Sequence, residues 1–157
     1  MKKINTFSIS NILGLIIGFL AVLQLLRSSD EAKLSGIDLP AAFPGKTGLA
    51  VIWGFIFLLW GIGVCFVYSV SLSPRTKRNI FLNSIILIIG IFVWNFMIFS
   101  SCNLSGALAV SAAVMLLAVV VWFMYLVTHR YGGYLFTPAV VWLLFVLYLS
   151  IALVVKN

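Results

Sequence analysis

Long uncharged hydrophobic runs alternate with short polar segments along the chain. A helix that crosses a hydrocarbon core of roughly 30 Å needs about 20 apolar residues, and five uncharged runs are long enough. These runs cover approximately residues 5–26, 48–72, 79–103, 104–128 and 134–155. The pattern therefore predicts an all-α integral membrane protein in which residues 1–157 form one domain, a bundle of five transmembrane helices.

Composition leads to the same class of protein. Hydrophobic residues make up 64% of the chain and charged residues only 8%, so the polar residues could not cover a water-exposed surface. The first run follows Lys2 and Lys3 as a signal peptide would, but its apolar part is too long and no small-x-small cleavage site precedes Arg27. We therefore expect this run to be a helix of the bundle.

The second run carries aromatic residues at helical spacing. Trp53, Phe57 and Trp60 fall at i, i+4 and i+7, which places them on one face of a helix. We interpret this face as one wall of a pocket for a flat, hydrophobic ligand. Ordinary packing between helices would produce the same stripe, so the pattern leaves both interpretations open.

Three further sites combine polar and aromatic residues. Asn95, beside Trp94, is costly in lipid unless it forms a hydrogen bond, so it is either a clamp between helices or a ligand contact. Trp122 and Tyr125, near the end of the fourth run, are typical of an interfacial aromatic belt. We expect the single histidine, His129, to have a structural or solvated role.

The first run has a face of small residues. Ser10, Gly14 and Gly18 follow one another at steps of four, a spacing that lets another helix approach closely. The approaching helix belongs either to the same bundle or to a second subunit.

Residues 27–47 form the one long polar connection, and they contain all three acidic residues of the chain. Loops of this length without secondary structure of their own are usually functional or disordered. Phe43 and Pro44 give the segment a stiff, partly apolar end just before the aromatic run. We interpret the segment as a lid over a pocket, although a plain linker would have the same features.

The distribution of basic residues predicts the orientation in the membrane. Placing the Arg75–Arg78 turn in the cytoplasm puts the amino terminus there as well, with six basic residues inside and four outside. The inner group is Lys2, Lys3, Arg75, Lys77, Arg78 and Arg130, and the outer group is Arg27, Lys33, Lys46 and Lys156. The net charge of +7 indicates contact with the anionic headgroups of a lipid bilayer rather than with nucleic acid.

Three stretches, in order, carry a resemblance to a known family. They are Ile52-Trp53 with Trp60-Gly61, then Trp94-Asn95-Phe96-Met97-Ile98-Phe99, then Gly132-Gly133-Tyr134-Leu135-Phe136-Thr137-Pro138 with Trp142 and Phe145. Over roughly residues 40–157 the chain resembles the translocator proteins, also called tryptophan-rich sensory proteins or peripheral-type benzodiazepine receptors. It departs from their pattern at Ile91 and Ser150, where the family has Asn, and in the loop before residue 44, which lacks the family's Trp.

The resemblance implies a five-helix bundle, often dimeric, in a bacterial cell membrane, with a pocket beneath the first loop. That pocket would accept porphyrins, related tetrapyrroles, sterols or aromatic drugs. It implies that Trp53 and Trp142 are the pocket tryptophans, with Trp94 and Phe145 adjoining them. Together with the aromatic stripe, the predicted ligand-binding residues are Trp53, Phe57, Trp60, Trp94, Asn95, Trp142 and Phe145, under a lid that includes Phe43 and Pro44.

These features favour a membrane-embedded binding or sensory protein for tetrapyrroles such as porphyrin or haem, or for sterols, with a role in their transport. A tryptophan-dependent porphyrin-degrading enzyme is the second hypothesis, but the predicted helices contain no acid, base or nucleophile cluster and no set of metal ligands. We therefore expect no metal and no cofactor. The composition is also compatible with passive transport or a purely structural role, whereas coupled transport normally needs charged residues within the bundle.

Overall fold

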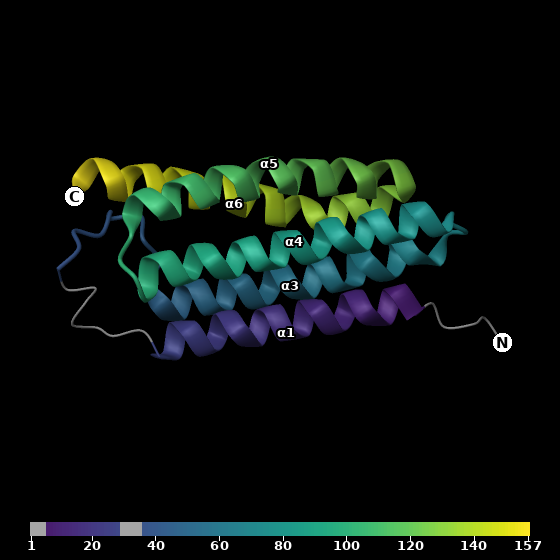
Figure 1. The fold of residues 1–157 in the computed structure, drawn as a ribbon, viewed down its shortest axis with the longest axis horizontal. Helices are drawn as coiled ribbons and strands as arrows, with labels where there is room; N and C mark the ends of the chain where they lie inside the picture. Colours follow the sequence, from purple (N-terminus) through teal and green to yellow (C-terminus); the bar gives the residue numbers. More distant parts are fainter. Residues whose placement is uncertain (1–5, 29–35) are drawn as a thin grey trace.

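Five long helices make up the computed structural model, which describes residues 6–28 and 36–157 (Figure 1). They are α1 (Thr6–Ser28), α3 (Gly45–Ser69), α4 (Pro74–Phe99), α5 (Leu104–Thr128) and α6 (Arg130–Lys156). Each of the five is long and apolar enough to cross a membrane. The predicted all-α bundle of five transmembrane helices is therefore confirmed.

Three helices begin earlier than the uncharged runs that predicted them. Helices α3, α4 and α6 start at residues 45, 74 and 130 rather than at 48, 79 and 134. The first turn of each of these helices contains a charged residue, so a search for uncharged runs leaves that turn out. Helix α4 shows this best, because Pro74 occupies its first turn and the Ser73 hydroxyl accepts a hydrogen bond from the Thr76 N–H at 3.2 Å.

Each helix packs against two neighbours, and the pairs close into a ring. Helix α1 contacts α3 and α4, α3 contacts α6, α6 contacts α5, and α5 contacts α4. The largest side chains of the bundle are enclosed by this ring. Those fully buried are Trp53, Trp60, Trp94, Tyr125, Phe99 and Phe136.

Glycine residues set two of the helix contacts. A Cβ atom added to Gly14 of α1 would lie 2.7 Å from the Cδ1 atom of Ile85 in α4, so the small face of α1 is occupied by a helix of the same bundle. At the contact of α3 with α6, a Cβ atom on Gly63 would lie 3.0 Å from the carbonyl oxygen of Gly132. The two backbones therefore approach each other at a point where neither helix tolerates a side chain without moving.

Helix α6 continues through a proline that the predicted start at residue 134 places within about its first turn. Pro138 lies inside the helix, eight residues after Arg130. Because proline has no N–H, the carbonyl of Tyr134 lacks its usual partner within the helix. The expected start of this helix was therefore wrong, and the turns before Pro138 belong to the part of α6 that approaches α3.

Candidate functional site

Trp60, one of two fully buried indoles in the aromatic stripe, holds helices together. The Trp60 N–H donates to the Tyr125 hydroxyl at 3.0 Å, and the Ser84 hydroxyl lies 3.2 Å from the same oxygen. The ring of Phe136 packs across Trp60 with centroids 4.9 Å apart. Trp60 thus ties α3 to α5 and α6 directly, and to α4 through the Tyr125 hydroxyl. The belt interpretation of Tyr125 was wrong, since this side chain is fully buried and hydrogen-bonded inside the bundle.

Two other tryptophans also join helices by their N–H groups. Trp94 donates to the hydroxyl of Ser150 at 2.9 Å, linking α4 to α6. Trp122 donates to the hydroxyl of Thr137 at 3.1 Å, linking α5 to α6. Both indoles therefore have a structural partner, although Trp94 was predicted to adjoin a ligand.

Trp53 and Trp142 differ from the other three tryptophans. Neither indole N–H has an acceptor among the residues that the structure describes. The two rings meet edge to face, with centroids 6.1 Å apart and planes at 89°. A buried donor without a partner costs about 1–3 kcal/mol, so two such donors side by side are an unusual concentration of unused hydrogen-bonding capacity.

Trp142 and Phe145 line a groove between α3 and α6. The groove has a volume of about 780 Å³. Ile52 and Ile56, on α3, contribute to its wall and stand on either side of Trp53 in the sequence. The remaining lining residues are Phe55, Tyr134, Thr137, Pro138 and Val141. Trp53 itself is fully buried, but it contacts Trp142, whose ring reaches the groove.

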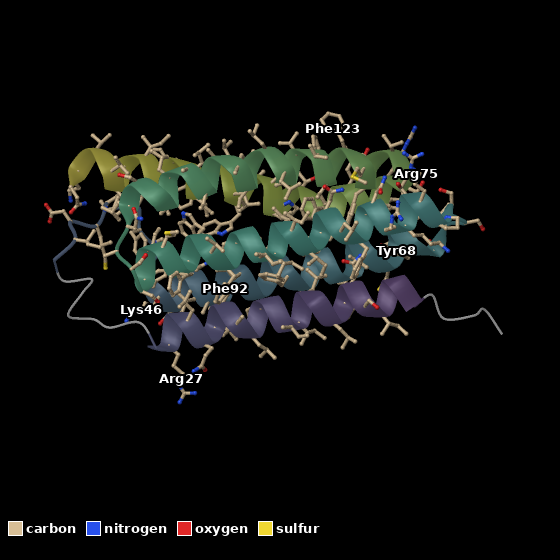
Figure 2. All side chains as sticks on the ribbon, in the orientation of Figure 1. Arg27, Lys46, Tyr68, Arg75, Phe92 and Phe123 are labelled. Carbon is tan, nitrogen blue, oxygen red and sulfur yellow. The ribbon has the colours of Figure 1, made fainter. Side chains whose placement is uncertain are left out.

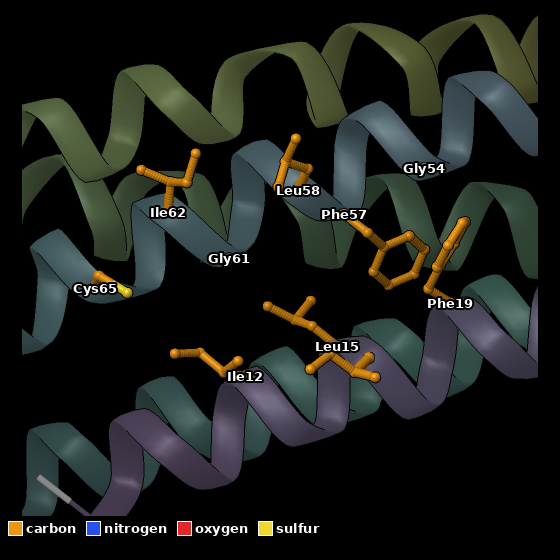
Figure 3. A pocket seen from close by; sticks show the side chains of 10 residues that line it. Ile12, Leu15, Phe19, Gly54, Phe57, Leu58, Gly61, Ile62 and Cys65 are labelled. Atoms are coloured by element: carbon orange, nitrogen blue, oxygen red, sulfur yellow. The ribbon is translucent and has the colours of Figure 1, made fainter.

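Phe57 lies on the other side of α3. It lines a groove of about 530 Å³ between α1 and α3, in which its ring faces that of Phe19 at a centroid distance of 5.8 Å (Figure 3). The Phe57 ring also lies 6.0 Å from Trp53 and stacks on Trp60 at 5.9 Å. Phe19, Phe57, Trp53 and Trp142 consequently form one row of aromatic rings that joins two grooves on opposite sides of α3.

Asn95 does not act as a clamp between helices. It is fully buried and its side-chain N–H donates to the carbonyl of Ile91, in the same helix, at 2.8 Å. Its side-chain oxygen has no donor within the described part of the chain. Trp94, the residue before Asn95, bonds to Ser150, so Asn95 lies near the level of Ser150 in the bundle. Ser150 follows Trp142 by eight positions, which is about 12 Å along α6 at 1.5 Å per residue, toward the end of the helix.

The described part of the predicted lid is fixed to the bundle. Phe43 packs against Phe99 of α4 at a centroid distance of 6.3 Å, and Pro44 caps the start of α3. The backbone N–H of Asp38 donates to the side chain of Asn157 at 2.8 Å, and the Asn157 amide donates back to the Asp38 carbonyl at 3.1 Å. Figure 1 shows this segment beside the carboxyl end of α6. Residues 29–35 lie outside the described residues.

Comparison with known families gives one result. A model of the TspO/MBR family matches residues 9–155. The chain belongs to the TspO/MBR family. Comparison with curated proteins finds no match. Membership in the TspO/MBR family confirms the resemblance found on the sequence, and it agrees with a multi-pass membrane protein that binds or transports ligands.

One departure of this TspO/MBR chain from the family pattern, Ser150, has a structural role. Ser150 accepts from Trp94 and donates to the Val146 carbonyl at 2.9 Å, so a hydroxyl makes the contact between α4 and α6. Ser150 thus leaves the Trp94 N–H with a partner inside the bundle. Asn95 bonds to the backbone carbonyl of residue 91, which any residue there would supply, so nothing in the structure explains Ile91.

Sequence reasoning missed two hydroxyl groups in the hydrogen bonds around the tryptophans. Thr137 binds Trp122, 15 positions away, and Ser84 lies against the Tyr125 hydroxyl, 41 positions away, so neither carries a signal in the sequence. His129 packs between Phe66 and Tyr131, with centroids 5.4 and 5.8 Å away. Across residues 6–28 and 36–157, no three His, Cys, Asp or Glu side chains gather as metal ligands would.

Proposed function

We propose that this protein binds a flat, hydrophobic ligand of the tetrapyrrole class inside the membrane, with Trp53 and Trp142 as the contacting pair. The proposal rests on one observation: of five tryptophans, these two have no partner for their N–H groups among the described residues, while Trp60, Trp94 and Trp122 each bond to another helix. The ring system of a flat ligand in the groove would stack on Trp142, and acceptor atoms on its edge would bond to the unused N–H groups of the pair.

The membrane environment supports a ligand role over simple packing. Lipid is as apolar as the face of an indole, so burial inside the bundle brings these rings little hydrophobic stabilisation. An unsatisfied N–H in such surroundings is a cost without a compensating gain in the free protein. Occupation by a ligand that accepts hydrogen bonds removes this cost.

The chemistry of porphyrins fits the same residues. A free-base porphyrin has a broad π face, carboxyl acceptors at one edge and pyrrole N–H donors at its centre. Asn95 has an unpartnered side-chain oxygen in the described part of α4, but it lies about 12 Å from the level of Trp142 and does not line the groove, so it is not assigned to the pyrrole N–H groups. The sequence from Leu49 to Ser73 has no charged residue, so the carboxylates would point to an end of the bundle, where charged residues and water can solvate them.

Titration with protoporphyrin tests the proposal. Purified protein is titrated in one detergent, and binding is followed by quenching of tryptophan fluorescence, with haem and a sterol as further ligands. Loss of one aromatic contact costs about 0.5–1.5 kcal/mol, so Trp53→Phe and Trp142→Phe should each weaken protoporphyrin binding by roughly tenfold or less.

Trp122→Phe is the matched control, because it removes an indole that already bonds to Thr137. This variant should keep the affinity of the wild type. Equal weakening in all three variants, or no weakening in Trp53→Phe and Trp142→Phe, would leave these rings as packing residues and refute the proposal.

Passive transfer of the same ligand is a second candidate, favoured by the aromatic row. Phe19, Phe57, Trp53 and Trp142 connect two grooves on opposite sides of α3. A ligand that enters either groove from the bilayer would meet one ring of this row in the groove wall, Phe57 on one side of α3 and Trp142 on the other. Vesicles containing the protein should then take up protoporphyrin faster than protein-free vesicles without any ion gradient, and Phe57→Ala should remove the difference.

A further inference from the structure

A third groove lies far from the tryptophan pair, between the first turns of α4 and the last turns of α5. It has a volume of about 340 Å³. Its lining residues are Thr76, Ile80, Phe123, Met124, Val127 and Thr128. Phe123 and Val127 are 56% and 86% exposed, so the groove presents apolar side chains outward, toward the lipid that surrounds a membrane-spanning helix.

Basic residues surround the end of this groove. Arg75 directly precedes the lining residue Thr76, and Arg130 follows Thr128 by two positions. Lys77 and Arg78 belong to the same turn of α4. Figure 2 shows Arg75 at the end of the bundle opposite Arg27 and Lys46, and Phe123 on the outer side of α5.

The four helices α3 to α6 contain no acidic residue that could neutralise these basic residues. The sequence contains no Asp or Glu after Asp38. Asp38 itself is held by Asn157 at the far end of α6. Both ends carry basic residues, but Asp38, the acidic residue of the described segments, lies at the far end, and the charged residues described at the groove end are all basic.

The chemical groups along the groove follow the same order as the parts of a phospholipid. The cationic residues come first, then the hydroxyls of Thr76 and Thr128, then apolar side chains. Phe123 precedes the last residue of α5 by five positions, about 8 Å along the helix at 1.5 Å per residue. This depth suits the upper part of an acyl chain below a headgroup that lies level with Arg75.

We propose that this groove binds one anionic phospholipid, whose phosphate pairs with Arg75 and its basic neighbours while an acyl chain lies along Phe123 and Val127. Arginine binds phosphate through charge-assisted hydrogen bonds, and basic pockets between helices at a membrane surface recognise anionic headgroups. The site is separate from the tryptophan pair, which lies between α3 and α6, and it does not depend on the proposed ligand function.

The test uses the purified full chain and native mass spectrometry with dioleoyl phosphatidylglycerol, dioleoyl phosphatidylcholine or inorganic phosphate. One phosphatidylglycerol should remain bound and raise the melting temperature. Arg75→Gln should weaken this binding about fivefold, which corresponds to about 1 kcal/mol for a basic residue near an anionic surface. Arg27→Gln removes the same charge at the opposite end and should leave binding unchanged.

Phe123→Ala tests the groove without changing charge. It should weaken binding of the dioleoyl lipid and leave any weak stabilisation by glycerol 3-phosphate, which has no acyl chain, unchanged. Equal binding of the two dioleoyl lipids, equal loss in Arg75→Gln and Arg27→Gln, or equal stabilisation by inorganic phosphate would overturn the proposal. A change from dimer to monomer in Phe123→Ala without loss of lipid would also overturn it, by assigning the surface to a second copy of the chain.

Discussion

Trp53 of α3 and Trp142 of α6 meet edge to face, with centroids 6.1 Å apart, and each has an indole N–H with no partner among the described residues. Seven positions along α3, Trp60 has the same burial as Trp53 but bonds to Tyr125. Residues of one aromatic stripe therefore have different tasks. The bonded indole stabilises the bundle, and the unbonded pair keeps donors free for another molecule.

This division predicts that Trp60→Phe destabilises the fold more than Trp53→Phe. Both substitutions remove the same atoms from fully buried positions, so the cavity contributions are similar. Only Trp60→Phe breaks a hydrogen bond, worth about 1 kcal/mol. Unfolding in mixed micelles should show this difference in the free energy of unfolding. Equal destabilisation would mean that the bond to Tyr125 contributes nothing to the stability of the bundle.

A second prediction concerns the contact of α3 with α6. Gly63→Val should destabilise the bundle by about 1–3 kcal/mol, the usual cost of overpacking, because a Cβ atom there lies 3.0 Å from the Gly132 carbonyl oxygen. Gly61→Ala is the control, since a Cβ atom on Gly61 meets nothing within 4 Å. It should leave the melting temperature unchanged or raise it through helix propensity. The prediction fails if both variants melt at the temperature of the wild type.

The sequence predicted the helices better than the site, for a physical reason. Each helix must span the same apolar layer, so the five uncharged runs reveal the helices without any knowledge of their neighbours. The role of a buried side chain depends on another helix. Trp53 and Trp60 share one stripe, and only the packing of Tyr125, 65 positions after Trp60, separates their roles. Tyr125 stands near the end of its helix, where a belt residue is expected, yet it points inward.

A third prediction is that the turn before α4 lies in the cytoplasm and the segment before α3 lies outside, as the distribution of basic residues indicates. Cys65 and Cys102 are first replaced by Ser. Ser71→Cys and Gly36→Cys then introduce a thiol at exposed positions without altering the charge. An impermeant maleimide should label Gly36→Cys in intact cells and Ser71→Cys only after permeabilisation. The reverse pattern would invert the orientation.

The last prediction is that the contact of Asn157 with Asp38 holds a lid, residues 36–44, against the bundle. Asn157 exchanges two hydrogen bonds with the backbone of Asp38, and Lys156 adds a third to the carbonyl of Leu39 at 3.1 Å. Asn157→Ala removes both bonds of the first pair. If residues 36–44 restrain a bound ligand, the off-rate of protoporphyrin should rise about fivefold for a loss of about 1 kcal/mol.

Lys156→Met, which removes only the single exposed bond to Leu39, is the control and should change the off-rate less. Hydrogen exchange in residues 36–44 should increase in Asn157→Ala while the helices remain protected, because the fastening lies outside the bundle core. Faster exchange with an unchanged off-rate would show that the segment is fastened to α6 but does not retain the ligand. In that case residues 36–44 act as a connection between α1 and α3, and release of the ligand proceeds by another route, such as the grooves on either side of α3.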